Sequence, residues 1–505
     1  MSSVTALLPL LALLVLRGIG LRFRPGIVVL PRWVDALLVV GLGGAGGVAA
    51  AGWYAPVHII GGDWIYHDFP DYCSVVAALA GGVDPPHSSR SLFVGRIVSA
   101  LTPPGRVFDG MVFGGWAGAL LLMVALAAWA RVVAGRAAAI VAVVVALAVG
   151  PLVLLTRTPT FYPLMDGVFA LAAAAAALAF RDGRWPMVAL AATLAGVCGM
   201  ADARGVTFAA WFGGAAALAA VLGPVRRVWR PWGAARGLAV VGLCGLATWG
   251  LGRSVHRVDQ CAYLEPQVLA FVNVVAERLA GPEATLKSYP VVCPPRRGFC
   301  WGWSEPRDLP VTVACVSEIL EALPPHLDLV AVDLHHARRT HLDPWLPVLL
   351  TAGLFSAVSL RRRPRALVAL LVPAVPFLSS WEFVGRTEID PRRLAPVLLF
   401  VPVVVGVASA AILGRGAAGG QRRWGVALGA GAAACWILVV SGTVPTWWAP
   451  QAGWRLPWIA NAEHAGLRVG KMVDTGSGRP ACSTALAPGP EDLSWDGVLG
   501  RLRPE

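Results

Sequence analysis

The chain has few charged residues and lacks the common sequence motifs of soluble enzymes. Of its 505 residues, 14% are charged and 57% are hydrophobic, and the mean hydropathy is +0.66. This composition excludes an ordinary soluble domain and is typical of a protein with many membrane spans. No Walker, dinucleotide-binding or nucleophile-elbow motif occurs, and no internal repeat is visible.

Long apolar runs predict the fold class. About 20 residues in a helix cross the hydrocarbon core of a bilayer, and most of the runs approach that length. The predicted spans are Val4–Leu16, Trp33–Tyr54, Met111–Val133, Ala137–Leu155, Met165–Phe180, Met187–Ala201, Val206–Leu222, Leu238–Leu251, Trp345–Leu360, Ala366–Ser380, Leu394–Leu413 and Trp424–Val440. We therefore expect an all-α fold, a polytopic transmembrane bundle of about 11–12 spans with a long extracytoplasmic loop.

Arginines mark every other connection between these spans. Connections that hold Lys and Arg stay in the cytoplasm, so the remaining connections face outward and carry most of the Asp and Glu. The net charge of +13 is then explained by attraction to anionic lipid, and no basic stripe indicates nucleic-acid binding. We expect a multi-pass protein of the cell (plasma) membrane whose partners include membrane lipid.

This orientation divides the chain into five regions. They are an apolar run and basic loop at 1–32, an N-terminal transmembrane module at 33–252 with the first outer loop at 55–110, an extracytoplasmic loop at 253–342, C-terminal transmembrane helices at 343–443, and an extracytoplasmic tail at 444–505.

Four cysteines lie in the long outer loop: Cys261, Cys293, Cys300 and Cys315. Disulfides persist outside the cytoplasm, so we expect this loop to be cross-linked, with three connectivities open. A zinc site is the alternative, but no Cys-x-x-Cys pair occurs.

Carboxylates gather in the first outer loop. Asp63, Asp68, Asp71 and Asp84 follow an apolar span within about twenty residues. Acids held at a membrane surface are natural candidates for chemistry. For any one of these acids loop solvation or helix capping is the better explanation, whereas the cluster as a whole favours function. Transfer of a sugar to a hydroxyl needs a base, and a carboxylate within hydrogen-bond reach is sufficient.

The same segment resembles a known family. Asp68-Phe-Pro-Asp-Tyr72, followed by Ala77-Ala-Leu-Ala-Gly-Gly82 and Asp84-Pro85, is similar to the first-loop pattern of bacterial polyprenol-phosphate-mannose-dependent mannosyltransferases of the GT-C superfamily. Pro86 stands where the family has a closing Tyr. The resemblance implies an integral-membrane glycosyltransferase with a polyprenyl-phosphate sugar donor and a glycan or glycolipid acceptor at the outer face, with no further cofactor.

The resemblance also implies roles for particular residues. Asp68 matches the family's catalytic base, and Asp71, three residues on, is the second candidate because the two carboxylates would raise each other's proton affinity. A phosphate leaving group needs cations. The predicted substrate-binding residues are Tyr72, Arg157, Tyr162, Asp202, Arg204, Arg386 and Arg392.

Three alternatives remain open at this point. His58, His67 and His87 flank the acids but form no recognised ligand set, so we expect no metal. A transporter or lipid flippase would have a similar number of spans, but it would place polar groups near the bilayer midplane. A non-catalytic envelope assembly protein would keep the same fold. An acid within a span, such as Asp166, is costly without an ionic partner, and Arg157 and Arg204 are the candidates. A purely structural ion pair explains these residues equally well.

Overall fold

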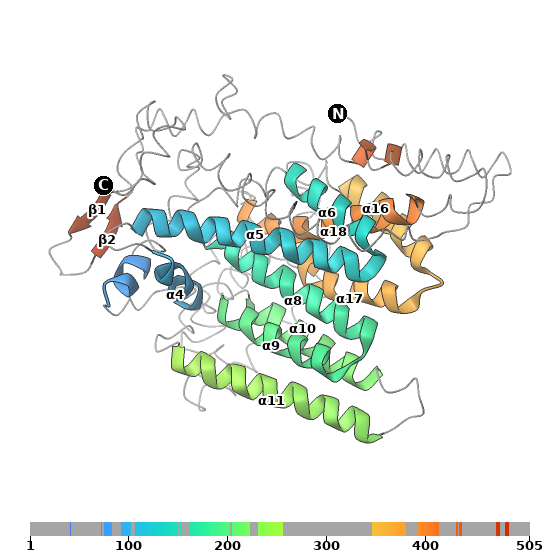
Figure 1. The fold of residues 1–505 in the computed structure, drawn as a ribbon, viewed down its shortest axis with the longest axis horizontal. Helices are drawn as coiled ribbons and strands as arrows, with labels where there is room; N and C mark the ends of the chain where they lie inside the picture. The colour runs from blue at the N-terminus through green and yellow to red at the C-terminus, as the bar shows by residue number, and fades with distance from the viewer. Residues whose placement is uncertain are drawn as a thin grey trace, which may run out of the picture.

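The computed structural model shows a bundle of helices (Figure 1). The residues it describes are 41, 72, 75–82, 92–102, 107–149, 152, 161–201, 205–222, 231–255, 346–379, 391–413, 431–432, 434–436, 471–474 and 480–483. The predicted span Val4–Leu16, nearly all of Trp33–Tyr54 and the four cysteines of the long outer loop lie outside them.

Nine of the predicted spans are helices in the described part of the chain, and a shorter helix precedes them. The helices are α4 (Leu92–Ala100), α5 (Val107–Ala134), α6 (Arg136–Ala148), α8 (Tyr162–Asp182), α9 (Trp185–Ala201), α10 (Gly205–Leu222), α11 (Pro231–Val255), α16 (Leu346–Leu360), α17 (Pro364–Ser379) and α18 (Pro391–Leu413). The predicted all-α fold class is confirmed for these residues, with one addition. In the tail, β1 (Lys471–Asp474) pairs antiparallel with β2 (Pro480–Ser483) across a Gly-containing connection of the kind that favours hairpins.

Helix α8 forms the centre of the bundle because its small side chains admit neighbours on every side. Residues 172–177 are six consecutive alanines, all buried. Helices α5, α9, α10, α17 and α18 all contact α8. Close packing of small residues is the usual way in which helices associate in lipid, where no hydrophobic force drives them together.

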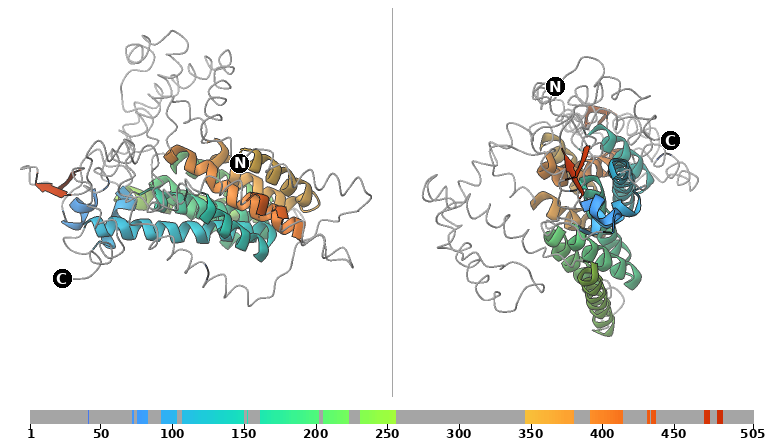
Figure 2. Two further views of the ribbon diagram at one scale, coloured as in Figure 1. Left: turned by 90° about the horizontal axis from the view of Figure 1, so that it is seen from above. Right: turned by 90° about the vertical axis from the view of Figure 1, so that its left-hand side faces the viewer.

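The outer surface of the bundle is apolar. Helix α11 contacts α9 and α10 and lies at the margin of the bundle when viewed end-on (Figure 2). On it, Leu243 and Leu246 are 67% and 66% exposed, and on α16 Leu350 is 64% exposed. Helices α5 and α8 contain segments long and apolar enough to cross a membrane, Gly114–Ala134 and Tyr162–Asp182. An apolar surface of this extent suits lipid better than water.

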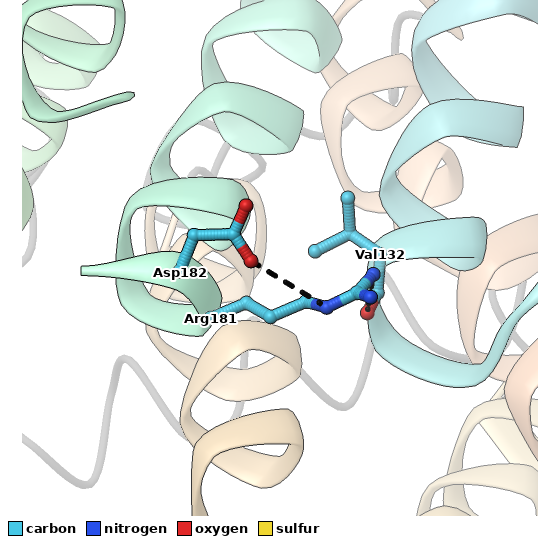
Figure 3. A network of polar contacts seen from close by, with 3 residues as sticks. All are labelled: Val132, Arg181 and Asp182. Carbon is cyan, nitrogen blue, oxygen red and sulfur yellow. Dashed lines mark hydrogen bonds and ion pairs between the residues drawn. The ribbon is translucent and has the colours of Figure 1, made fainter. Parts of the chain in front are cut away.

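Two arginine-bearing connections lie at the same end of the bundle, as the alternation predicts. Arg181, in the last turn of α8, donates a hydrogen bond from Nη1 to the carbonyl oxygen of Val132, near the end of α5, at 3.2 Å (Figure 3). Its Nε lies 3.8 Å from Oδ1 of Asp182. Both side chains are exposed, so the ion pair itself contributes little stability, but the hydrogen bond brings the ends of α5 and α8 together.

Helix α17 contains two prolines, and tryptophan side chains of other helices supply the hydrogen bonds that these prolines cannot donate. Proline donates no hydrogen bond to the carbonyl four residues earlier, so Pro373 and Pro376 release the carbonyls of Ala369 and Val372. Trp129 of α5 donates Nε1–H to the first at 3.0 Å, and Trp211 of α10 donates to the second at 2.7 Å. The prolines thereby fix α17 against both neighbours.

The last predicted span also packs in the bundle where it is described. Residues 431–432 and 434–436 are helical. The buried Trp436 donates Nε1–H to Oγ1 of Thr351 on α16 at 3.0 Å, and its ring meets Phe355 edge-on with centroids 5.8 Å apart. A buried indole that has a polar partner keeps its full packing contribution without a desolvation cost.

Candidate functional site

Three aromatic rings join the end of the Asp68–Tyr72 motif to the bundle. Tyr72, the last residue of the Asp68–Tyr72 motif, stacks on Phe161 with ring centroids 4.3 Å apart and meets Tyr162 edge-on at 5.9 Å. All three side chains are buried, and Phe161 and Tyr162 stand at the start of α8. Stacked and edge-on pairs of this kind contribute beyond their buried area, by about 0.5–1.5 kcal/mol each. The motif therefore ends at a fixed point beside α8.

Glycines on α5 allow this region to pack closely. Gly110, Gly114 and Gly118 lie four residues apart and so share one face of the helix. A Cβ at Gly110 would collide with Thr102, and one at Gly114 would stand 2.8 Å from Cγ2 of Val98 on α4. At Gly118 a Cβ would lie 2.5 Å from the carbonyl carbon of Pro163, at the start of α8.

A further glycine, on α4, completes the contact with the aromatic rings. A Cβ at Gly95 would stand 2.7 Å from Cγ1 of Val75 and 3.5 Å from Cζ of Phe161. Val75 follows Tyr72 by three residues and is itself buried. The segment that begins at Tyr72 is thus packed against α4 and the start of α8.

One acid is buried one helical turn along α8 from Tyr162. Asp166 is 2% exposed and is the only buried Asp, Glu, Lys, Arg or His among the residues whose side chains the structure describes. It follows Tyr162 by four residues and therefore lies on the same face of α8. An ionisable side chain within an apolar helix is costly to bury, and such residues usually serve substrates, ions or proton transfer.

The end of α9 and the start of α10 contact the same part of α8. The Cys198 thiol lies 3.9 Å from the carbonyl oxygen of Val168. Phe208 of α10 stacks on Phe169 with centroids 4.4 Å apart. A Cβ at Gly205 would lie 3.3 Å from the ring of Phe169, which follows Asp166 by three residues. The corner residues 202–204 therefore connect two helix ends that both contact α8 close to Asp166.

The structure brings two of the predicted site residues together, namely Tyr72 and Tyr162. Arg392 stands in the first turn of α18, which begins at Pro391. The other predicted residues lie outside the described part of the chain: Asp68, Asp71, Arg157, Asp202, Arg204 and Arg386.

Two features of the site were not predicted. Phe161 was overlooked because a single aromatic residue before a span carries no sequence signal. The glycine face of α5 does carry one, since Gly110, Gly114 and Gly118 repeat the Gly-x-x-x-Gly spacing that favours close helix contact. Within the described residues no group of three or more His, Cys, Asp or Glu is placed to hold a metal ion. The expectation that the protein uses no metal stays a prediction.

Comparison with known proteins gives structural similarity alone. No family model matches the chain, and no curated protein sequence matches it. The crystal structure of ArnT from Cupriavidus metallidurans bound to undecaprenyl phosphate is similar with a TM-score of 0.41 and 14% identity, covering 86% of this chain and 74% of that one. The apo crystal structure of the Archaeoglobus fulgidus oligosaccharyltransferase gives 0.38 and 12%, covering 82% of this chain and 58% of that one.

Proposed function

We propose that the protein is an integral-membrane glycosyltransferase of the GT-C superfamily. In this proposal it transfers a sugar, with mannose as the first candidate, from a polyprenyl-phosphate donor to an envelope glycolipid or polysaccharide at the outer face of the cell membrane. The observation that carries the proposal is the contact of Tyr72 with Phe161 and Tyr162, because it fixes the end of the acidic motif at the start of α8, one helical turn from the buried Asp166.

The proposed reaction needs a base, a sugar and a stabilised leaving group. The acceptor hydroxyl attacks the anomeric carbon, its proton passes to the Asp68 carboxylate, and the bond from that carbon to the lipid-phosphate oxygen breaks. Negative charge grows on the departing phosphate. Guanidinium groups bind phosphate with two parallel hydrogen bonds, and Arg386 and Arg392 are the candidates.

The position of the buried acid favours an enzyme over a transporter. Asp166 is the fifth residue of a 21-residue helix, close to the end at which the aromatic rings gather. A transporter is expected to hold its polar groups near the middle of its spans. In the described parts of the spans, the other buried polar residues are Ser and Thr, two of which, Thr248 and Thr351, bond to backbone carbonyls of their own helix.

The test is sugar transfer by the purified full-length protein in lipid vesicles, with polyprenyl-phosphate mannose as donor and extracted envelope glycolipid as acceptor. Asp68→Asn keeps the size of the side chain and removes the base, so the rate should fall by about a hundred- to ten-thousand-fold. Asp71→Asn should cost less, because it changes only the charge near the base.

The matched control is Asp182→Asn. Asp182 is an exposed acid at the opposite end of α8, so its loss should leave the transfer rate unchanged. A dead Asp71→Asn protein beside an active Asp68→Asn protein would exchange the two roles. If the parent protein transfers no sugar from any polyprenyl-phosphate donor, the transporter or assembly-protein alternative becomes the better explanation.

A further inference from the structure

The turn between α16 and α17 concentrates positive charge in a small space. Leu360 is followed by Arg361, Arg362 and Arg363, and after Pro364 comes Arg365. The turn is tight: the amide of Arg363 donates to the carbonyl of Leu360 at 2.7 Å, and the amide of Leu367 donates to that of Arg363 at 3.1 Å. Arg361, Arg362 and Arg363 are all exposed.

No acid neutralises this charge within the described residues. Residues 344–381, which include both helices and the turn, contain no Asp or Glu. Asp182, at the end of α8, lies beside Arg181 instead. The amino end of α17 adds its own partial positive charge, because the first amides of a helix have no intrahelical acceptor. Like charges held this close repel one another, and a bound anion offsets that repulsion.

The surface next to the turn is apolar. On α16 Leu350, Leu354 and Val358 lie four residues apart and are 64%, 50% and 44% exposed. On α17 Leu371 and Val375 are likewise exposed and four residues apart. A ligand that fits both features has an anionic head and hydrocarbon chains.

The turn also lies at a defined end of the bundle. Trp129, near the end of α5, donates its indole N–H to Ala369 of α17, and Figure 1 shows the α16–α17 turn at the end of the bundle where α5 and α8 finish. This is the end where Arg181 binds the carbonyl of Val132. The arginines therefore stand where the headgroups of one leaflet would lie.

We propose that the α16–α17 turn is a binding site for an anionic phospholipid. The exposed guanidinium groups of Arg361, Arg362 and Arg363 hold the headgroup phosphate by paired hydrogen bonds, and the acyl chains lie along the exposed leucines of α16 and α17. This site is separate from the proposed catalytic site, which lies at the opposite end of α8. It does not depend on the proposed function.

The test compares two double variants of the full-length protein that lose the same charge. Arg361→Gln with Arg362→Gln removes two members of the cluster. Arg184→Gln with Arg236→Gln removes two exposed arginines outside the cluster, one between α8 and α9 and one in the second turn of α11. Each protein is mixed in detergent with dioleoylphosphatidylglycerol or dioleoylphosphatidylcholine, and retained lipid is counted by native mass spectrometry alongside thermal stability.

We expect the parent protein to retain phosphatidylglycerol in preference to phosphatidylcholine. The cluster variant should lose about tenfold or more in affinity for phosphatidylglycerol, because each arginine near an anionic lipid contributes several-fold. The control variant should resemble the parent. Arg361→Lys with Arg362→Lys should be intermediate, since it keeps the charge but loses the planar fork.

Three results would overturn the proposal. The first is equal retention of the two lipids by the parent. The second is an equal loss of phosphatidylglycerol from both Gln variants, which would mean that lipid binding depends on the total charge of the protein and not on this turn. The third is displacement of the lipid by millimolar inorganic phosphate, which would identify a soluble anion as the ligand.

Discussion

Trp129 and Ala369 are joined by a buried hydrogen bond of 3.0 Å between the indole N–H of α5 and a backbone carbonyl of α17. The carbonyl is available only because Pro373 stands four residues later. The bond thus links a side chain in one helix to an irregularity in another, 240 residues away in sequence. Backbone carbonyls without partners are costly in lipid, so this contact stabilises the fold.

Replacing Trp129 with Phe should destabilise the protein by about 1–3 kcal/mol, because the carbonyl of Ala369 loses its donor in a buried place. In a Pro373→Ala background the same replacement should destabilise the protein less, since the amide of residue 373 can then donate to the carbonyl of Ala369. Thermal unfolding of the two single variants and the double variant in detergent gives the coupling energy between Trp129 and Pro373. Additive costs would mean that Trp129 contributes only through ring packing with Phe377 and Phe400.

Gly118→Ala should lower the free energy of unfolding by about 1–3 kcal/mol, because the new methyl group would press on the backbone of Pro163 and Leu164. The matched control is Gly213→Ala on α10, where no atom lies within 4 Å of the added Cβ. That change should be neutral, or stabilising by up to about 1 kcal/mol, since alanine favours helix. Equal melting temperatures for both variants would contradict the close approach of α5 and α8.

Asp166→Asn should lower sugar transfer by about tenfold or more while changing the melting temperature little. The amide fills the same volume but removes the charge, and a hydrogen bond to a charged group is stronger by about 1–2 kcal/mol than one to a neutral group. Ser409→Ala is the control, because its hydroxyl is buried in α18 without a hydrogen-bond partner. A parallel loss of stability and activity in Asp166→Asn would assign the acid a structural role only.

Arg386→Lys should weaken use of the polyprenyl-phosphate donor more than Arg422→Lys, which changes an arginine in the predicted cytoplasmic connection before Trp424–Val440. Lysine keeps the charge but cannot bind phosphate with a planar fork. Donor concentration curves for both variants give the apparent affinity. Indistinguishable curves would remove Arg386 from the proposed phosphate site.

The helices were predictable from the sequence because apolar length alone determines where a span lies. The predicted run Val206–Leu222 differs from α10 by a single residue, and Trp345–Leu360 differs from α16 by one. The start of α5 at Val107 was placed four residues late, because Asp109 interrupts the apolar run. Helix α4 was missed entirely, since nine residues inside a loop give too short a pattern.

Contacts between helices were less predictable than the helices. The sequence singled out Tyr72 and Tyr162 separately, but nothing in it states that their rings meet. The prolines of α17 are visible in the sequence as helix breaks, yet their partners Trp129 and Trp211 lie in distant spans. Pairings of this kind depend on the arrangement of the bundle in space, which a pattern along the chain does not encode.

The two prolines of α17 also bear on how the chain is assembled during synthesis. Taken alone in the bilayer, this helix would carry two carbonyls with no donor, at Ala369 and Val372. Its donors belong to α5 and α10, which leave the ribosome well before it. When α17 enters the membrane, the helices that carry both indoles have therefore already been made. A chain shortened from the amino end past α5 would lack the indole that donates a hydrogen bond to the carbonyl of Ala369.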